Sequence, residues 1–295
     1  MSPSLLPRIH QRVFIVGCPR SGTTLLQSLL ASHPTITSFP ESKYFLDLVS
    51  FPVETSKRHA LGIVSPRLRQ TCIDFFNEID QPELVNRLPR LPLMRLYTQR
   101  FVDILDDLTQ QRQKSIWIEK TPDHLHHIAY IEKYVPAPKI IHIVRNGADV
   151  VASLYDLVQR YPDFWGRFLK TLDDCIERWR SDIQLTRQYL GQPNHTLLRY
   201  ETLIESVADE TQRLCQFIGV EYEAGTLDAY RTTSRSLVRS REGWKDGTQD
   251  KIQTPTSRKF FKVFDQVQQT YVLDALEDID LDSLGNRTTP ELTTV

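Results

Sequence analysis

Residues 13–30 read VFIVGCPRSGTTLLQSLL, and they form the stretch of this chain best suited to holding an anion. A buried β-branched run leads into a loop that contains Gly17 and Gly22, and a helix-period segment follows at once. Glycines here allow a tight turn and the close approach of a ligand, and the first N–H groups of a helix attract negative charge. The pattern predicts a phosphate-binding loop around a cation, Arg20. An ordinary strand-to-helix turn with a threonine cap is the alternative.

This loop lacks the lysine of the nucleoside-triphosphate P-loop. Thr23 stands where that motif has lysine, and the positive charge in the loop is Arg20. A guanidinium can bind an oxyanion through two parallel hydrogen bonds. The apolar run 139–144 is followed by Arg145, where a Walker-type ATPase carries an aspartate that holds Mg²⁺. We therefore expect an anion site without a metal, and a P-loop phosphotransferase (a kinase) is the alternative.

A second anion site is expected in KIIHIVRNGADVVASL, residues 139–154. Arg145 follows a buried strand, at the edge where open α/β sheets bind their ligands. Ser153 comes two turns into the helix predicted at 148–159. Together with the first loop, these residues indicate a nucleotide that carries phosphates at two separate ends.

The two motifs PRSGTT (19–24) and VRNGADVVAS (144–153) resemble the signature motifs of the sulfotransferases that use 3′-phosphoadenosine 5′-phosphosulfate. The similarity continues in HPTITSFPES, IEKTPDH and LRYETL, in the order of the family, and covers roughly residues 13–203. The arginine in the loop and the later glutamate resemble the bacterial and tyrosylprotein enzymes more than the cytosolic aryl enzymes, whose loop has lysine and whose base is histidine. The resemblance implies a sulfotransferase, with adenosine 3′,5′-bisphosphate as the spent donor.

The resemblance also implies roles for the matching residues. The residues assigned to the 5′-phosphosulfate are Arg20, Ser21, Gly22, Thr23 and Thr24. Arg145 and Ser153 are assigned to the 3′-phosphate, and Tyr200 is placed near the nucleotide, with a core aromatic as the alternative. Arg241 and Lys259 lie where the family closes a C-terminal segment over the nucleotide. Solvated surface charges are the alternative for both.

Sulfuryl transfer passes a loose group in line between two oxygens, so positioning and charge neutralisation carry most of the catalysis. We expect Glu41 to take the acceptor's proton, because the short extended segment 35–39 returns the chain toward the loop. Its distance from Arg20 also matches the glutamate base of the tyrosylprotein-type enzymes. A carboxylate that merely starts a helix at 41–49 is the alternative, and His124 is the second candidate for the base.

Charge neutralisation at the reacting centre is expected from Arg20 and Lys120. Lys120 follows a buried strand in the sequence EKTP, so it lies at the same sheet edge as Arg20, and a solvated lysine is the alternative. Three histidines follow at 124, 126 and 127 and could suggest a metal site. No third ligand with a recognisable spacing accompanies His124 and His127, so we expect a surface cluster at a helix start and no metal.

Apolar runs alternate with helix-period segments along the chain. We expect buried parallel strands at 13–17, 115–119, 139–145 and 195–200, and irregular stretches at 51–69 and 234–257. Helices are expected at 23–32, 93–108, 125–134, 148–159, 168–190, 201–218 and 260–276. This alternation predicts an α/β fold of P-loop-like type, a central parallel sheet with helices on both faces. We expect one domain over 1–295, with a core at about 13–220 and a segment and helix that cover the nucleotide at about 234–280.

The overall composition excludes several classes of protein. With 36 basic and 37 acidic residues, the chain lacks the basic surplus of a dedicated nucleic-acid binder. No apolar run reaches the roughly 18 residues of a membrane span. The four cysteines are widely spaced and form no dense disulfide pattern. We therefore expect a soluble, cytoplasmic enzyme.

The acceptor is expected to offer a hydroxyl or an amine on a small molecule or natural product, rather than on a protein. The near-neutral net charge of −1 disfavours a polyanionic polysaccharide as the acceptor. A protein that binds the nucleotide without catalysis is a further alternative, and the presence of Glu41 and Lys120 counts against it. The oligomeric state stays open.

Overall fold

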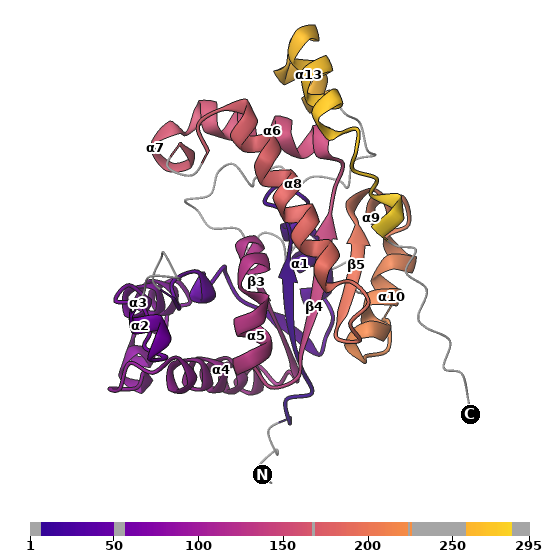
Figure 1. Cartoon of the computed structure of the whole chain (residues 1–295). Helices are drawn as coiled ribbons and strands as arrows, with labels where there is room; N and C mark the ends of the chain where they lie inside the picture. Colours follow the sequence, from indigo (N-terminus) through magenta and orange to yellow (C-terminus); the bar gives the residue numbers. More distant parts are fainter. Residues whose placement is uncertain (1–6, 50–56, 167–168, 224, 226–257, 285–295) are drawn as a thin grey trace, which may run out of the picture.

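A parallel sheet of five strands forms the centre of the molecule (Figure 1). The computed structural model describes residues 7–49, 57–166, 169–223, 225 and 258–284. The strands are β1 (Gln11–Val16), β2 (Ile36–Ser38), β3 (Ile116–Lys120), β4 (Pro138–Val144) and β5 (His195–Arg199). Their order is β2-β3-β1-β4-β5, and every neighbouring pair is parallel. All five carboxyl ends therefore meet at one edge of the sheet, where such sheets bind ligands.

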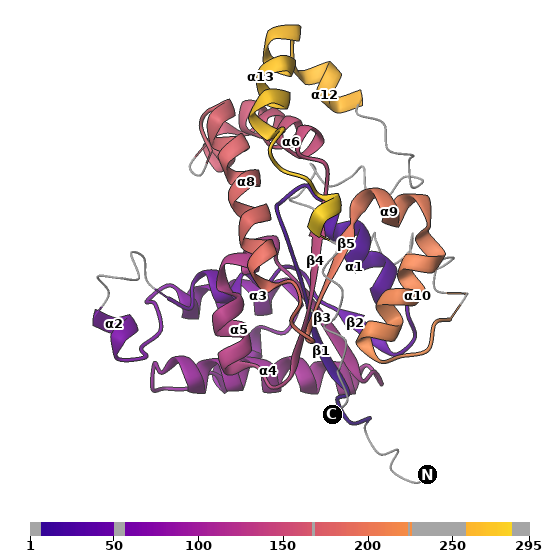
Figure 2. The same cartoon turned by 45° about the vertical axis from the view of Figure 1, so that its right-hand side comes forward.

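Helices cover both faces of this sheet (Figure 2). The α-helices are α1 (Thr23–Ala31), α2 (Lys57–Ala60), α3 (Leu68–Glu78), α4 (Met94–Gln111), α5 (Ile128–Tyr134), α6 (Gly147–Arg160), α7 (Pro162–Trp165), α8 (Leu172–Tyr189), α9 (Tyr200–Glu205), α10 (Val207–Ile218), α12 (Arg258–Val263) and α13 (Gln266–Leu276). The 3-10 helices are η1 (Tyr44–Leu46), η2 (Pro82–Arg87), η3 (Pro122–His127) and η5 (Asp282–Leu284). Within the described ranges, no helix combines the length and the apolar character needed to cross a lipid bilayer.

Alternate residues of β1 face the two helical layers, as the pleat of a strand requires. Val13 and Ile15 are buried in the core that α1, α9 and α10 close, whereas Phe14 and Val16 are buried in the core closed by η1, α3, α4 and α5. A third apolar cluster joins α6, α8, α12 and α13. The central strand is thus covered on both sides, which explains its continuous apolar sequence.

The predicted fold class, an α/β fold with a parallel sheet and helices on both faces, is confirmed. The four predicted strands are present, and the sheet has a fifth, β2. Residues 35–39 were expected to form only an extended link, but Ile36–Ser38 pair with β3 from Ile116 to Ile118. A strand of three residues is too short to give a periodic signal.

Two long predicted helices are each broken in two. The prediction of one helix at 201–218 is wrong, because Ser206 has non-helical backbone angles (φ −136°, ψ 59°) between α9 and α10. The prediction at 260–276 is wrong in the same way. Asp265 interrupts it and caps α13, since its side chain accepts a hydrogen bond from the Gln268 N–H at 2.9 Å.

Three other predicted boundaries also differ. The helix expected at 125–134 begins as the 3-10 helix η3 and becomes α-helical only at Ile128. The helix expected from residue 168 begins at Leu172, where Thr171 and Asp174 form a capping box. The stretch 51–69, expected to be irregular, contains α2 and the start of α3. Residues 234–257 lie outside the described residues.

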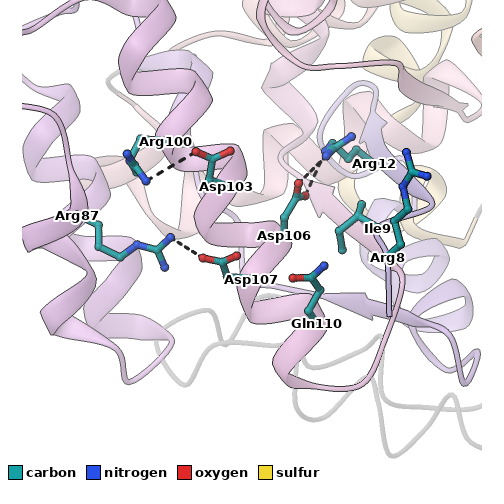
Figure 3. Close-up of a pocket in the computed structure, with 9 residues that line it drawn as sticks. All are labelled: Arg8, Ile9, Arg12, Arg87, Arg100, Asp103, Asp106, Asp107 and Gln110. Carbon is teal, nitrogen blue, oxygen red and sulfur yellow. Dashed lines mark hydrogen bonds and ion pairs between the residues drawn. The ribbon is translucent and has the colours of Figure 1, made fainter. Parts of the chain in front are cut away.

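A polar cavity of about 530 Å³ lies near the start of β1, away from the carboxyl ends of the strands (Figure 3). Arg12 donates to both oxygens of Asp106 on α4, at 3.1 and 2.5 Å, and the buried Trp117 indole donates to the same carboxylate at 2.7 Å. Arg87 pairs with Asp107 at 2.5 Å. These contacts fasten β1, β3 and η2 to α4.

The four cysteines are free thiols inside the protein: Cys18, Cys72, Cys175 and Cys215. Burial raises the pKa of Cys72 and of Cys175 to about 12. At neutral pH these two side chains are therefore protonated and pack as small apolar groups.

Candidate active site

The loop between β1 and α1 has the backbone shape of an anion cradle. Gly17 has a φ of 152°, and a Cβ there would lie 2.3 Å from the carbonyl oxygen of Ile143 in β4. Gly22 has a φ of 93°, and a Cβ there would lie 2.3 Å from the ring of Tyr200. Glycine is thus required at both positions. The amide of Gly17 donates to the carbonyl of Pro122 at 3.3 Å, which ties the loop to the end of β3.

Arg20 and Ser153 bring the two sequence motifs into contact. Arg20 Nε donates to Ser153 Oγ at 3.1 Å. Burial lowers the pKa of Arg20, and the nearby guanidinium of Arg145 lowers it further. Two cations that share a partly buried site repel each other unless an anion lies with them. Asp149 pairs with Arg145, and Asp156 raises the pKa of Arg20 against these two effects. The two guanidiniums together would attract a further anion to this place.

Two hydrogen-bond donors at this site, Ser21 Oγ and Arg145 Nε, are buried and lack a partner within the described residues, as does one acceptor, Asp149 Oδ1. Buried polar groups of this kind are costly unless a ligand or water pairs with them. Arg145 is held in place from two sides, since its Nη2 lies 3.3 Å from Asp149 and its carbonyl accepts a hydrogen bond from Trp179 at 3.1 Å. The donors left over could pair with an anion.

Tyr200 and Lys259 lie beside the two arginines, Arg20 and Arg145, of this site. The guanidinium carbon of Arg145 lies 4.4 Å from the centroid of the Tyr200 ring, a cation–π arrangement. Lys259 of α12 lies 2.8 Å from Asp156 and 3.5 Å from Ser153 Oγ. The sequence prediction grouped Lys259 with Arg241, which lies outside the described residues.

Glu41 and Lys120 form an ion pair at the same edge of the sheet. Lys120 Nζ lies 2.5 Å from Glu41 Oε1 and 3.5 Å from Thr24 Oγ1 of α1. The Lys120 side chain is 2% exposed and that of Glu41 12%. The β2–β3 pairing, with Ser38 beside Ile118, returns the chain so that the two residues meet. The alternative of a helix that starts at residue 41 and runs to 49 is wrong, because the described residues 41–49 form only the short 3-10 helix η1.

Comparison with known proteins identifies the family. The sequence profile described as "Sulfotransferase family" matches residues 12–224. The chain belongs to the sulfotransferase family. The nodulation protein NoeE of Sinorhizobium fredii is 27% identical to it over 223 residues, which cover 70% of this chain and 50% of that protein. Protein-tyrosine sulfotransferase A of Caenorhabditis elegans is 20% identical over 225 residues, covering 73% of this chain and 51% of that protein. The chain thus spans about half the length of the curated relatives it matches.

Solved sulfotransferase structures share the fold. The sulfotransferase domain from the curacin biosynthetic pathway superimposes with a TM-score of 0.56 at 19% identity, over 92% of this chain and 99% of that one. A mouse sulfotransferase complexed with PAP superimposes with a TM-score of 0.53 at 13% identity, over 95% of this chain and 91% of that one. The resemblance predicted from the two motifs, and the P-loop-like fold that it implied, are confirmed.

The three histidines at 124, 126 and 127 do not form the surface cluster that the sequence predicted. His124 and His127 are buried, because η3 packs beneath η1 and against β1. His124 Nε2 accepts the Phe45 N–H at 3.2 Å, and its Nδ1 lies 2.8 Å from Glu119. One ring nitrogen is therefore hydrogen-bonded and the other lies against a buried carboxylate, which counts against His124 as the second candidate for the base. Within the described residues, no three His, Cys, Asp or Glu side chains group as metal ligands.

Sequence reasoning overlooked two polar groups that lie beside the candidate site. Glu119 is buried beside Lys120. Arg178 of α8 pairs with Asp123, just beyond the EKTP sequence, and lies 2.8 Å from Asp182. A charged residue inside an otherwise apolar strand, as in WIEK, was the signal that could have revealed Glu119.

Proposed function

We propose that this protein transfers a sulfuryl group from 3′-phosphoadenosine 5′-phosphosulfate to a hydroxyl or amine of an acceptor. The observation that carries the proposal is the hydrogen bond from Arg20 to Ser153, with Arg145 alongside. This hydrogen bond brings the first and second motifs side by side. A single donor molecule that carries both a 5′-phosphosulfate and a 3′-phosphate needs the two motifs to be neighbours. Family membership and the PAP complex of a structural neighbour support the same donor.

The donor's charged groups would be bound by the residues whose polar atoms converge on the loop and on α6. The unpartnered Ser21 Oγ and Arg145 Nε supply donors, and the N–H groups at the start of α1, a helix that begins with Thr23, supply more. Ser153 and Lys259 would contribute to the 3′-phosphate side, and Tyr200 would support Arg145. When bound, the donor supplies an activated sulfuryl group.

Glu41 is proposed as the base that takes the acceptor's proton. The ammonium of Lys120 lies 2.5 Å from the Glu41 carboxylate and orients it at the edge of the sheet. A carboxylate in its ionised form can accept a proton. Lys120 also approaches Thr24 of the loop, so one cation touches both the proposed base and the proposed donor site. We propose that Lys120 and Arg20 neutralise the charge that develops during transfer.

The C-terminal helices are proposed to close the donor site. Lys259 lies against α6 in the described structure, and Phe260 and Phe264 are buried in the apolar cluster of α6 and α8. This packing supports one domain over 1–295. Residues 234–257, including Arg241, lie outside the described residues, and their place over the nucleotide is proposed from the family resemblance alone. The cytoplasmic location stays part of the proposal.

The acceptor is proposed to be a small molecule. The names of some relatives point instead to tyrosine in proteins, so the assay must offer both classes. Purified protein would be incubated with radiolabelled donor and with panels of alcohols, phenols, amines and tyrosine peptides. Labelling of small molecules supports the proposal, and labelling confined to peptides would contradict it.

The donor site is tested by thermal unfolding with nucleotides. Adenosine 3′,5′-bisphosphate should raise the melting temperature, and 5′-AMP should raise it much less. Arg145→Ala should remove most of the difference, because a hydrogen bond to a charged group contributes about 1.5–3 kcal/mol. Arg100→Ala, on the distant surface of α4, is the matched control. Equal stabilisation by both nucleotides would contradict the proposed 3′-phosphate site.

A further inference from the structure

The segment that follows Glu41 leads into the short helix η1, and side chains satisfy its first backbone N–H groups. Four consecutive backbone N–H groups, those of residues 42–45, each donate to a side-chain atom. Their acceptors are Glu119 Oε1 at 3.1 Å, Thr121 Oγ1 at 3.3 Å, Ser42 Oγ at 3.2 Å and His124 Nε2 at 3.2 Å. The place of Glu41 therefore depends on these four side chains.

Glu119 connects the other three of these side chains. Its Oε1 accepts from the Ser42 hydroxyl at 2.8 Å and from the Thr121 hydroxyl at 2.7 Å, and its Oε2 lies 2.8 Å from His124 Nδ1. Because the Phe45 N–H donates to Nε2 of His124, a neutral ring carries its proton on Nδ1, facing Glu119. The Ser42 and Thr121 hydroxyls thus donate to Glu119 Oε1, and the ring of His124 faces Oε2.

Glu119 is 1% exposed and nevertheless stays ionised. Burial acts to raise the pKa of Glu119, but His124 and the hydrogen bonds from Thr121 and Ser42 outweigh it, so the pKa lies below its usual value. A buried carboxylate is tolerated only where donors satisfy it. In this chain the donors are the hydroxyls of Ser42, which follows Glu41, and of Thr121, which follows Lys120.

We propose that Glu119 is a positioning residue that holds the 42–45 segment against the end of β3 and thereby sets Glu41 against Lys120. The inference rests on the proposed role of Glu41 as base. Glu119 adjoins Lys120 in the chain, and Ser42 adjoins Glu41, so one carboxylate restrains both members of the ion pair through their neighbours. Glu119 is not among the residues proposed to contact the donor or the acceptor.

Glu119→Gln tests the proposal, because the amide keeps the shape but replaces one acceptor oxygen with a donor. That donor would face either the hydroxyls or the proton on His124 Nδ1, so at least one contact is lost. We expect turnover to fall by about 10- to 100-fold, as for a displacement of about 1 Å at a reacting group. The affinity for adenosine 3′,5′-bisphosphate should stay within about twofold, since the donor site is not touched. Glu119→Asp, which keeps the charge, should recover part of the turnover.

Glu132→Gln is the matched control, because Glu132 also accepts from a histidine, His195 at 3.0 Å, but lies on α5 outside the site. It should leave turnover unchanged. Ser42→Ala offers a milder second variant, since it removes one hydroxyl of the group and keeps Glu119. It should slow turnover less than Glu119→Gln does. Full turnover in both Glu119→Gln and Ser42→Ala would overturn the proposal.

Amide hydrogen exchange separates this inference from the proposed function. In Glu119→Gln, the amides of residues 42–45 should exchange at least about tenfold faster, while those of α4 keep their rates. Unchanged exchange at 42–45 would overturn the positioning role whether or not the protein transfers sulfate. Faster exchange in a protein whose wild type transfers no sulfuryl group would support the restraint and contradict the proposed function.

Discussion

The guanidinium of Arg145 lies over the ring of Tyr200, with 4.4 Å between the guanidinium carbon and the ring centroid. The same ring fills the space beside Gly22, where a Cβ would meet it at 2.3 Å. A single aromatic side chain thus fixes the separation between the loop after β1 and the end of β4. The spacing of the two motifs depends on this packing.

Gly22→Ala should weaken nucleotide binding as well as stability, because the new methyl group must displace the Tyr200 ring. Gly191→Ala is a well-matched control, since Gly191 has a φ of 94°, like the 93° of Gly22, but nothing lies within 4 Å of its Cβ position. Both variants should lose about 1 kcal/mol from backbone strain. Only Gly22→Ala should also lose bisphosphate affinity, which calorimetric titration would measure. Equal behaviour of the two variants would show that the ring does not hold the loop.

Glu41→Gln should slow turnover by about 10²- to 10⁴-fold, because the amide keeps the shape but cannot accept a proton. Bisphosphate affinity should persist, since Glu41 is proposed to face the acceptor. Lys120→Ala should slow turnover and also weaken donor binding, because Lys120 approaches Thr24 of the loop at 3.5 Å. Steady-state kinetics and nucleotide titration of both variants would check this. Near-normal turnover in Glu41→Gln would remove its assignment as the base.

Sulfuryl transfer should continue in the presence of EDTA, because the proposed mechanism neutralises charge with Arg20 and Lys120. The measurement is the initial rate with and without chelator, repeated after addition of Mg²⁺. An absolute requirement for magnesium, together with turnover of ATP, would favour the phosphotransferase alternative.

Asp106→Asn should destabilise the protein, because the Asp106 carboxylate accepts hydrogen bonds from the buried Trp117 indole and from Nε and Nη2 of Arg12. Hydrogen bonds to a charged group contribute about 1.5–3 kcal/mol, so a loss of about 2 kcal/mol is expected in urea unfolding. Asp103→Asn is the control, since Asp103 lies 3.8 Å from Arg100 and both side chains are about half exposed. It should change stability by less than about 0.5 kcal/mol. Similar losses in the two variants would contradict the importance of the Trp117 contact.

Acid should destabilise the fold through two buried histidines. Burial lowers the pKa of His127 and of His142 to about 3, whereas an unfolded histidine titrates near 6.5. Unfolding therefore takes up protons between pH 6.5 and pH 3, and the free energy of unfolding falls as the pH decreases through that window. Each histidine should contribute about 1.4 kcal/mol per pH unit there.

Chemical denaturation at pH 7.5 and pH 5.5 would measure this slope. His142→Leu removes one of the two groups and should reduce the slope, whatever it does to stability at pH 7.5. An unchanged slope in that variant would mean that His142 does not remain neutral in the folded state.

The sheet and the loop were predictable from sequence because their signals are local. Val13 to Val16 read as a buried strand, and the glycines on either side of Arg20 read as a turn into a helix. The hydrogen bond between Arg20 and Ser153 could not be predicted, since it joins residues 133 positions apart through side-chain direction. The burial of His124 was missed for a similar reason, because it depends on η1 packing over η3. Asp265 breaks a periodic apolar segment by its cap, a local feature that the apolar period concealed.

Arg20 has a φ of 76°, in the left-handed region that favours glycine. A non-glycine residue there costs roughly 1–2 kcal/mol in backbone energy. A library selected only for thermal stability should therefore replace Arg20 with glycine or asparagine, whereas a library selected for sulfate transfer should keep the arginine. Sequencing both libraries would show whether residue 20 differs between the two selections. A difference would mean that the proposed role of Arg20 in transfer is kept at a cost in folding stability.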